Sequence, residues 1–301
     1  MTLTTLLNRT GRPMGVRILG NGPPCVLLHG FAMESRYWLP FAWPLRRRFR
    51  FILPDLRGFG ASHDTPLDRA CVLSDYADDL EDILDQLDLR DVALGGISMG
   101  AFVGLRYRAM HGFGRVGRYL HIDQSPRVLN GPDWQHGIFG ARQGPFLDQL
   151  RLLLAEARRH GRHTPYDALP EAFRRDLWGA FSTFTAAAMG SPLRELIARK
   201  GMRHERIGRA VLPMQSWFAY VDVLSAYLEQ DYDMRPVLPG IDVPTTVMIG
   251  MRSKMYPPEG QMEVVRKVPG ARAVRFERSG HSLIIDQPAL FARELRTFLE
   301  R

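Results

Sequence analysis

The chain has 301 residues, of which 45% are hydrophobic and 24% are charged, and it carries a formal net charge of +8 at neutral pH. This length allows one large core with a modest insertion, and the composition is typical of a soluble globular protein. The chain lacks a run of about eighteen apolar residues and a basic leader followed by an apolar stretch. We therefore exclude a membrane protein and expect a cytoplasmic one.

Arginine supplies almost all of the positive charge, because lysine occurs only at positions 200, 254 and 267. The arginine clusters at 45–50 and 156–163 are short and separated, without the regular interleaving of aromatic side chains that would stack on bases. We interpret them as solvated faces and expect no nucleic-acid partner. The two cysteines, Cys25 and Cys71, cannot form a disulfide framework, and we expect buried or free thiols.

Strand and helix patterns alternate over the first 126 residues. Residues 15–20 and 25–30 are apolar runs on either side of Asn21-Gly22, and this pattern predicts two strands joined by a tight turn. A third strand is predicted to break at Pro54.

A helix is predicted over residues 73–89, because apolar side chains recur three and four positions apart, and Ser74 is expected to be its N-cap. Two further strand patterns follow: residues 91–100 contain a buried strand that runs into a turn, and residues 115–124 form the next strand pattern.

Strand patterns disappear between about residues 127 and 235, where helical patterns dominate, and they return at 243–250 and 271–277 before a final helix. We predict an α/β fold with a mostly parallel, doubly wound sheet formed by residues 1–126 and 236–301. Residues 127–235 are expected to form an inserted helical cap above the carboxyl edge of the strands, where ligands bind in open α/β sheets.

The segment Gly96-Ile97-Ser98-Met99-Gly100 follows the apolar strand Val92–Leu94 and precedes a helix-compatible stretch, Ala101 to Met110. This G-x-S-x-G pattern is typical of a nucleophile elbow, in which a serine occupies a sharp, strained turn. The glycines are expected because a Cβ would clash with the neighbouring strand and helix. Ser98 is therefore the candidate nucleophile.

Two backbone N–H groups are candidates for an oxyanion hole. Phe31 follows the strand and turn at Leu28-His29-Gly30, and Met99 follows the candidate nucleophile. Each such donor contributes on the order of 3 kcal/mol of transition-state stabilisation. We interpret the His29 side chain as a structural hydrogen-bonding group, because another histidine is better placed.

That histidine is His281, which follows the last predicted strand and precedes the last predicted helix. The chain order, with the serine first and the histidine near the end, matches triads on α/β-hydrolase sheets. His281 is the candidate general base and acid.

The chain resembles the α/β-hydrolase superfamily in its capped form. The motifs span nearly the whole chain apart from the cap; they are VLLHGF (26–31), PDLRGFGAS (54–62), GGISMG (95–100), VPTTVMIGMRS (243–253) and SGHSLIIDQP (279–288). The resemblance implies a structural turn near the active site for PDLRGFGAS. It does not identify a substrate, since this fold hosts many chemistries.

One position departs from the family pattern. Most members have an aspartate where this chain has Ser253, and a triad without its charged partner loses about 10⁴ in kcat. Asp123 ends the strand that follows the nucleophile's strand and helix, so right-handed crossovers should place the two strands side by side. We expect Asp123 to replace the missing acid, as certain dehalogenases resembling this layout place theirs. Turn or helix capping is the alternative role.

Two other acids are less suitable. Asp286 precedes Gln287-Pro288 at the start of the final helix and is expected to be an N-cap. Asp222 lies within a predicted cap helix and would need a long reach.

The substrate pocket is expected to be apolar, because aromatic and methionine side chains recur in the cap and after the vacated acid position. The pocket candidates are Trp217, Phe218, Met255 and Tyr256. Packing of the cap onto the core is the alternative role of each. Arg252 or Lys254 is a candidate for binding a substrate carboxylate.

These residues together predict a serine hydrolase that cleaves an ester or thioester of a mainly apolar small molecule through an acyl-enzyme, without a metal or organic cofactor. Three alternatives stay open: an acyltransferase, a carbon–carbon bond hydrolase and a non-catalytic binding protein. The substrate's identity and the oligomeric state are not predicted.

Overall fold

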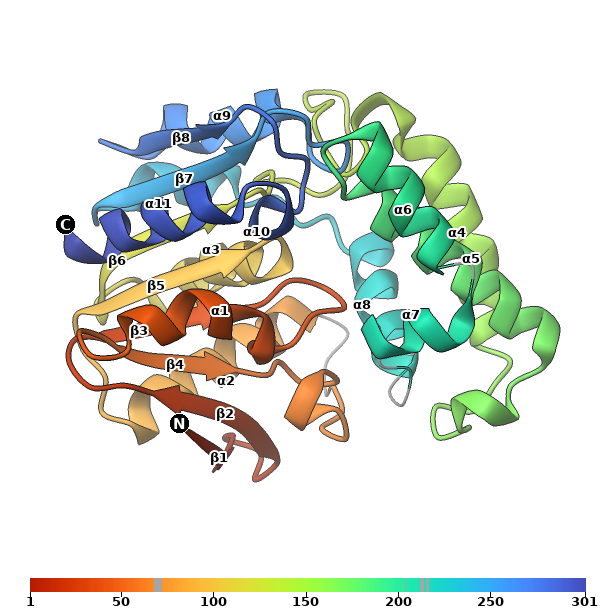
Figure 1. Ribbon diagram of the computed structural model, residues 1–301, viewed down its shortest axis with the longest axis horizontal. Coiled ribbons are helices and arrows are strands. Elements are labelled where there is room, and N and C mark those ends of the chain that lie inside the picture. The colour runs from red at the N-terminus through yellow and green to blue at the C-terminus, as the bar shows by residue number, and fades with distance from the viewer. Residues whose placement is uncertain (68–71, 203, 212–213, 215–216) are drawn as a thin grey trace.

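A computed structural model describes residues 1–67, 72–202, 204–211, 214 and 217–301. Its centre is an eight-stranded sheet with the order β1-β2-β4-β3-β5-β6-β7-β8 (Figure 1). The strands are β1 (Thr2–Leu7), β2 (Pro13–Leu19), β3 (Pro24–Leu28), β4 (Arg50–Pro54), β5 (Val92–Ile97), β6 (Val116–Ile122), β7 (Thr245–Gly250) and β8 (Arg272–Phe276). Strands β3 to β8 run parallel to one another, whereas β2 pairs antiparallel with β4, and β1 pairs antiparallel with β2 at the edge of the sheet.

Helices pack on both faces of this sheet, which confirms the predicted α/β class. The helices of the sheet region are α1 (Leu39–Ala42), α2 (Val72–Gln86), α3 (Met99–His111), α9 (Pro258–Lys267), α10 (Leu283–Asp286) and α11 (Pro288–Glu300). One apolar cluster joins the sheet to α1 and α11 through side chains such as Ala42 and Phe291. The other joins the opposite face to α2 and α3 through side chains such as Leu80 and Phe102.

The first two predicted strands form, but they are not partners. β2 pairs with β4, and β3 lies between β4 and β5. The connection between β2 and β3 turns sharply at Gly20, where φ is +85° and a Cβ would lie 2.2 Å from the carbonyl oxygen of Arg46. Only glycine tolerates this approach, so position 20 requires glycine where the chain passes the segment that leads into β4. Strand β1 was not predicted.

Ser74 is not the N-cap of the first long helix, because it lies inside α2. Its hydroxyl oxygen accepts hydrogen bonds from Arg106 Nε at 3.1 Å and Nη2 at 2.8 Å, which join α2 to α3. The Cys25 thiol is free and buried, and burial raises its pKa. Cys71 lies outside the described residues.

A helical segment connects β6 to β7. It contains α4 (Gln143–Ala157), α5 (Glu171–Ala187), α6 (Pro192–Met202), α7 (Glu205–Val211) and α8 (Trp217–Glu229). Figure 1 shows these helices beyond the carboxyl ends of the central strands. The cap boundaries at 127 and 235 remain a prediction. Among the described residues, none of the helices has both the length and the apolar character needed to cross a membrane.

Two matched glycines test the close packing of the elbow helix. Gly100 and Gly144 each occupy the second position of an α-helix, α3 and α4. A Cβ on Gly100 would lie 2.4 Å from the Leu28 carbonyl oxygen, whereas one on Gly144 would have no neighbour within 4 Å. We expect Gly100→Ala to lower the free energy of unfolding by about 1–3 kcal/mol, and Gly144→Ala to raise it by about 0.5–1 kcal/mol. Urea denaturation measures the free energy of unfolding of both variants. Equal changes in the two variants would contradict the close packing of Gly100 against Leu28.

Candidate active site

Ser98 occupies a strained turn between β5 and α3, with φ 52° and ψ −121°. Its N–H donates to the Ile122 carbonyl oxygen at 2.8 Å, and its own carbonyl accepts from Phe102 N–H at 3.1 Å. A Cβ on Gly96 would lie 2.2 Å from the carbonyl carbon of Gly100. The two glycines therefore allow the tight turn that the G-x-S-x-G pattern predicts.

His281 lies between β8 and α10 and contacts the two other predicted triad residues. Its Nε2 is 2.9 Å from Ser98 Oγ, and its Nδ1 is 2.6 Å from Asp123 Oδ2. An ionised carboxylate only accepts hydrogen bonds, so Nδ1–H donates to Asp123 and Nε2 is left to accept from the serine hydroxyl. The structure thus brings the three predicted residues into one hydrogen-bonded chain.

The Asp123 side chain is fully buried and accepts four hydrogen bonds. Besides His281, Oδ2 accepts from Ser253 Oγ at 2.8 Å. Oδ1 accepts from Gly250 N–H at 2.7 Å and from Gln261 Nε2 at 2.9 Å. A buried carboxylate requires such donors. Its bonds reach across the fold instead of capping a local turn or helix.

Ser253 and Gln261 are site residues that sequence reasoning did not place. Ser253 was noted as the position that lacks the family's aspartate, and its hydroxyl donates to Asp123. Gln261 comes from α9, and its amide also donates to the Tyr256 carbonyl oxygen at 2.9 Å. No local signal marks a glutamine in an amphipathic helix as a carboxylate partner, because the contact depends on how α9 packs.

Asp286 is not the N-cap of the final helix. It is the last residue of α10, and Gln287 occupies the N-cap position of α11. Its Oδ2 accepts from the N–H groups of Gly190 and Gly280, each at 2.8 Å, and its Oδ1 lies 2.8 Å from Arg194 Nη1. The carboxylate therefore connects the helical segment to the loop that carries His281.

The proposed oxyanion donors flank the serine. Phe31 and Ser98 line one cavity of about 130 Å³, and a Cβ on Gly30 would lie 3.4 Å from Ser98 Cβ. Met99 is the first residue of α3, where backbone N–H groups have no partner within the helix. Both N–H groups therefore belong to segments adjacent to the serine.

His29 takes part in a structural hydrogen-bond pattern beside this cavity. Its Nδ1 donates to the Gly30 carbonyl oxygen at 2.8 Å, and its Nε2 accepts from Leu56 N–H at 3.0 Å. Burial lowers the pKa of His29, which agrees with a neutral ring. The imidazole holds the turn after β3 against the loop after β4.

The loop after β4 contains the predicted structural turn. Asp55 accepts from Ser35 N–H at 2.6 Å and from Ala61 N–H at 2.9 Å. The buried Arg57 guanidinium forms two hydrogen bonds to Asp79, at 2.6 and 2.7 Å. These groups stabilise the turn and its attachment to α2.

The cavity beside Ser98 is bounded mainly by apolar side chains from both parts of the fold. They include Phe31, Met33, Phe184, Met189, Ile284 and Ile285. The four predicted pocket residues are not among the described residues that line it. The helix and the loop that carry these four residues direct their side chains away from this cavity.

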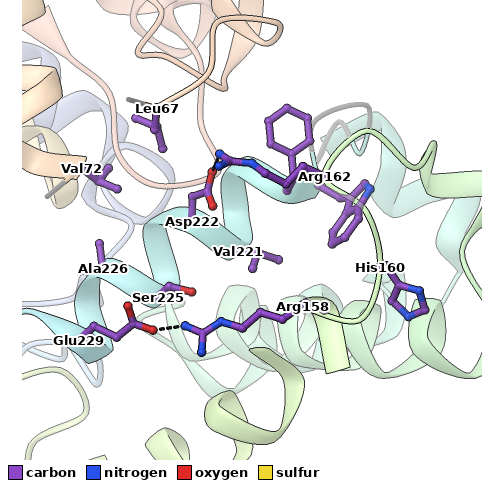
Figure 2. A pocket seen from close by; sticks show the side chains of 13 residues that line it. Leu67, Val72, Arg158, His160, Arg162, Val221, Asp222, Ser225, Ala226 and Glu229 are labelled. Carbon is purple, nitrogen blue, oxygen red and sulfur yellow. Dashed lines mark hydrogen bonds and ion pairs between the residues drawn. The ribbon is translucent and has the colours of Figure 1, made fainter. Parts of the chain in front are cut away.

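Trp217 and Phe218 line a different cavity of about 490 Å³ between α8 and neighbouring segments, which we call the α8 pocket. Figure 2 shows the Arg158–Glu229 ion pair beside it. The Trp217 indole N–H donates to the Thr164 carbonyl oxygen at 2.8 Å, so this ring packs within the helical segment. Asp222 also lines the α8 pocket.

Met255 and Tyr256 are buried beneath the site instead of lining its cavity. The Tyr256 ring lies 5.8 Å from the His281 ring. From α8, it is Tyr220 that faces the site, with its ring 5.5 Å from the Phe31 ring. Helical periodicity alone does not show which face of α8 the fold turns toward the serine.

The two candidate cations for a substrate carboxylate already have partners. Arg252 Nε donates to the Glu277 carbonyl oxygen at 3.1 Å, and Lys254 Nζ lies 2.6 Å from Glu195 Oε2. Neither is among the described residues lining the cavity beside Ser98.

Comparisons with known proteins agree with this fold. A family model described as alpha/beta hydrolase family matches residues 25–294. The AB hydrolase superfamily protein YisY of Bacillus subtilis is 25% identical over 90% of each chain. A pimeloyl-acyl-carrier-protein methyl ester esterase of Legionella pneumophila is 24% identical, covering 93% of this chain and 97% of that protein. An esterase structure from Exiguobacterium antarcticum superposes with a TM-score of 0.79 at 22% identity, covering both chains completely.

A buried histidine near the site predicts how stability depends on pH. His121, on β6, is completely buried, and burial lowers its pKa from 6.5 to about 4. Between these values the unfolded chain binds a proton that the folded chain does not, so stability falls as pH decreases from about 6.5 to 4. One such group contributes a slope of up to about 1.4 kcal/mol per pH unit.

We expect His121→Gln to reduce the pH dependence of the free energy of unfolding by about this slope between pH 4.5 and 6. The matched control is His204→Gln, which makes the same side-chain replacement at an exposed position. Urea denaturation at a series of pH values measures how the free energy of unfolding of each variant depends on pH. Parallel curves for the wild type and His121→Gln would contradict the expected depressed pKa.

Proposed function

The chain belongs to the alpha/beta hydrolase family, and we propose that it is a serine hydrolase that cleaves an ester or thioester of a mainly apolar small molecule. The observation that carries the proposal is the continuous chain of hydrogen bonds from Asp123 through His281 to Ser98. The esterase names of several relatives support an ester substrate.

In the proposed mechanism, Ser98 Oγ attacks the carbonyl carbon while His281 Nε2 accepts the hydroxyl proton. The tetrahedral oxyanion accepts hydrogen bonds from the N–H groups of Phe31 and Met99. His281 then gives the proton to the departing alcohol or thiol, which leaves an acyl-enzyme on Ser98. Water activated by His281 cleaves this intermediate and restores the serine.

Asp123 is proposed to hold the imidazole in the reactive tautomer and to stabilise the imidazolium that forms. Its other three donors, the Gly250 N–H, Ser253 and Gln261, fix the direction of the carboxylate. This arrangement supplies the charged partner that the chain lacks at position 253.

An apolar substrate is proposed from the side chains around Ser98. Phe31 and Met33 come from the sheet region, whereas Phe184 and Met189 come from the helical segment. We propose that residues 127–235 act as a cap, because side chains from this range form part of the cavity wall. Burial of an apolar acyl group there contributes about 25 cal/mol per Å² of surface removed from water.

Two substitutions test the triad. We expect Ser98→Ala to abolish hydrolysis of p-nitrophenyl acetate, because no acyl-enzyme can form. Asp123→Asn is expected to lower kcat by about 10³- to 10⁴-fold, because the imidazolium loses its charged partner. Stopped-flow detection of nitrophenolate measures both, and circular dichroism establishes that each variant is folded.

Asp222→Asn is the matched control, since it removes a carboxylate that pairs with Arg162 in the helical segment. It should retain kcat within about twofold of the wild type. A loss under tenfold in Asp123→Asn would contradict the acid's role, and hydrolysis that survives Ser98→Ala would contradict the proposed nucleophile.

A further inference from the structure

A second apolar cavity lies next to the one that contains Ser98. It has a volume of about 530 Å³ and lies along α4 and α5, and we call it the α4–α5 groove. Its lining is mainly apolar and includes Phe139, Phe146, Leu150, Leu153, Phe173 and Phe184, while the charged residues Glu156, Arg175 and Asp176 also line it. It is about four times as large as the 130 Å³ cavity beside the serine.

Phe184 lines both cavities, so its ring stands at their junction. The centroid of the Phe184 ring lies 5.6 Å from the ring centroid of Phe31, which is beside Ser98. It lies 6.3 Å from the ring centroid of Phe139, which lines the groove. The two cavities are therefore adjacent, separated at this point by one aromatic side chain that is only partly buried.

The backbone of Phe139 has an unusual conformation for a bulky residue, with φ +60°. Such a conformation costs of order 1–3 kcal/mol and is retained where the surrounding structure enforces it. Here the Phe139 N–H donates to the Met255 carbonyl oxygen at 2.5 Å, and its ring lies 4.4 Å from that of Phe146. The strained residue thus contributes an aromatic wall to the groove.

We propose that the α4–α5 groove binds the distal part of a long apolar chain whose ester carbonyl lies at Ser98, with Phe184 at the entrance. This inference rests on the proposed ester hydrolysis and extends it to a substrate class. The cavity beside the serine takes the short portion next to the carbonyl, and the apolar groove removes the remaining chain from water. Leu152 at the groove is 74% exposed and gives such a chain a further apolar surface.

Two alanines on α5 allow a matched test. Ala180 and Ala172 are both exposed, but only Ala180 is among the groove-lining residues. We expect Ala180→Trp to fill the groove and lower the ratio of kcat/KM for p-nitrophenyl decanoate to that for the acetate at least tenfold. Ala172→Trp should leave this ratio within twofold of the wild type. Phe184→Ala should raise the decanoate-to-acetate ratio of kcat/KM, because it opens the junction between the two cavities.

An Ala180→Trp ratio within twofold of the wild type would overturn the groove proposal, as would a wild-type enzyme that hydrolyses the acetate but not the decanoate. Failure of the underlying function is distinguishable, because it would appear as acetate hydrolysis that persists in Ser98→Ala. Both tryptophan substitutions are at exposed positions, and their thermal midpoints check that the fold is retained.

A different set of contacts supports a second inference, at the loop that carries His281. Asp286 Oδ2 accepts from Gly280 N–H, next to the histidine, and from Gly190 N–H in the helical segment. On the other side of the histidine, Ser282 N–H donates to the Ala188 carbonyl oxygen at 3.0 Å. The helical segment therefore holds the histidine loop on both sides.

The backbones at Gly190 and Gly280 lie so close together that neither position has room for a Cβ atom. A Cβ on Gly190 would lie 2.2 Å from the Gly280 nitrogen, and a Cβ on Gly280 would lie 2.7 Å from the Gly190 nitrogen. We infer that Asp286 is a positioning residue that sets the place of His281 relative to Ser98 through this contact, which also rests on the proposed function.

We expect Asp286→Ala to lower kcat for p-nitrophenyl acetate at least tenfold while KM changes less than threefold, because the histidine loses its support but the cavity remains. Asp286→Asn keeps an acceptor oxygen and should recover most of kcat. Glu277→Ala removes an exposed carboxylate from the same loop and serves as the unchanged control.

A kcat within threefold of the wild type in folded Asp286→Ala would overturn this role. Equal losses in Asp286→Ala and Asp286→Asn, with thermal midpoints like the wild type, would overturn it too, because the acceptor oxygen would then be irrelevant. If Asp286→Ala does not fold, the test is the kcat of Asp286→Asn divided by the kcat of Glu277→Ala. A ratio below one tenth would contradict the inference, because Asp286→Asn keeps an acceptor oxygen.

Discussion

A carboxylate buried in a protein interior must find hydrogen-bond donors, because the charged group loses its hydration on folding. Asp123 meets this requirement by drawing donors from several elements: the end of β7 at Gly250, the following loop at Ser253, α9 at Gln261 and the loop after β8 at His281. These donors follow Asp123 by up to 158 positions in the chain. One buried charge therefore fixes the mutual placement of the carboxyl ends of β6, β7 and β8.

The location of the acid also explains the serine at position 253. Had both Asp123 and residue 253 been carboxylates, two negative charges would share one buried site, which strongly disfavours ionisation of one of them. With a hydroxyl at 253, the side chain donates to Asp123 at 2.8 Å and leaves a single charge facing the imidazole. The departure at 253 and the carboxylate at 123 are thus two parts of one electrostatic arrangement.

Much of this site was predictable, because its positions follow from backbone rules. The crossover rule placed β6 beside β5, and the register of Ile97 with Ile122 brings Ser98 and Asp123 to the same edge. The sheet order at β2 and the orientation of α8 were not predictable, since both depend on tertiary packing. Asp286 was misread for the same reason. Its position before a proline suggests a local cap, whereas its partners Gly190 and Arg194 lie more than ninety positions away.

The two strand ends that carry Ser98 and Asp123 both have strained backbone conformations. Ser98 has φ +52° and Asp123 has φ +45°, conformations that cost of order 1–3 kcal/mol each for residues with side chains. Both are held by backbone hydrogen bonds to the adjacent strand, from Ser98 N–H to Ile122 and from Asp123 N–H to Met248. Consecutive strands thus stabilise one another's strained ends in the order β5, β6, β7. The buried central strands β5 and β7 and the largely buried β6 supply the rigidity that keeps both side chains directed at His281. The helical segment contributes side chains to the cavity wall and supports the loop that carries His281.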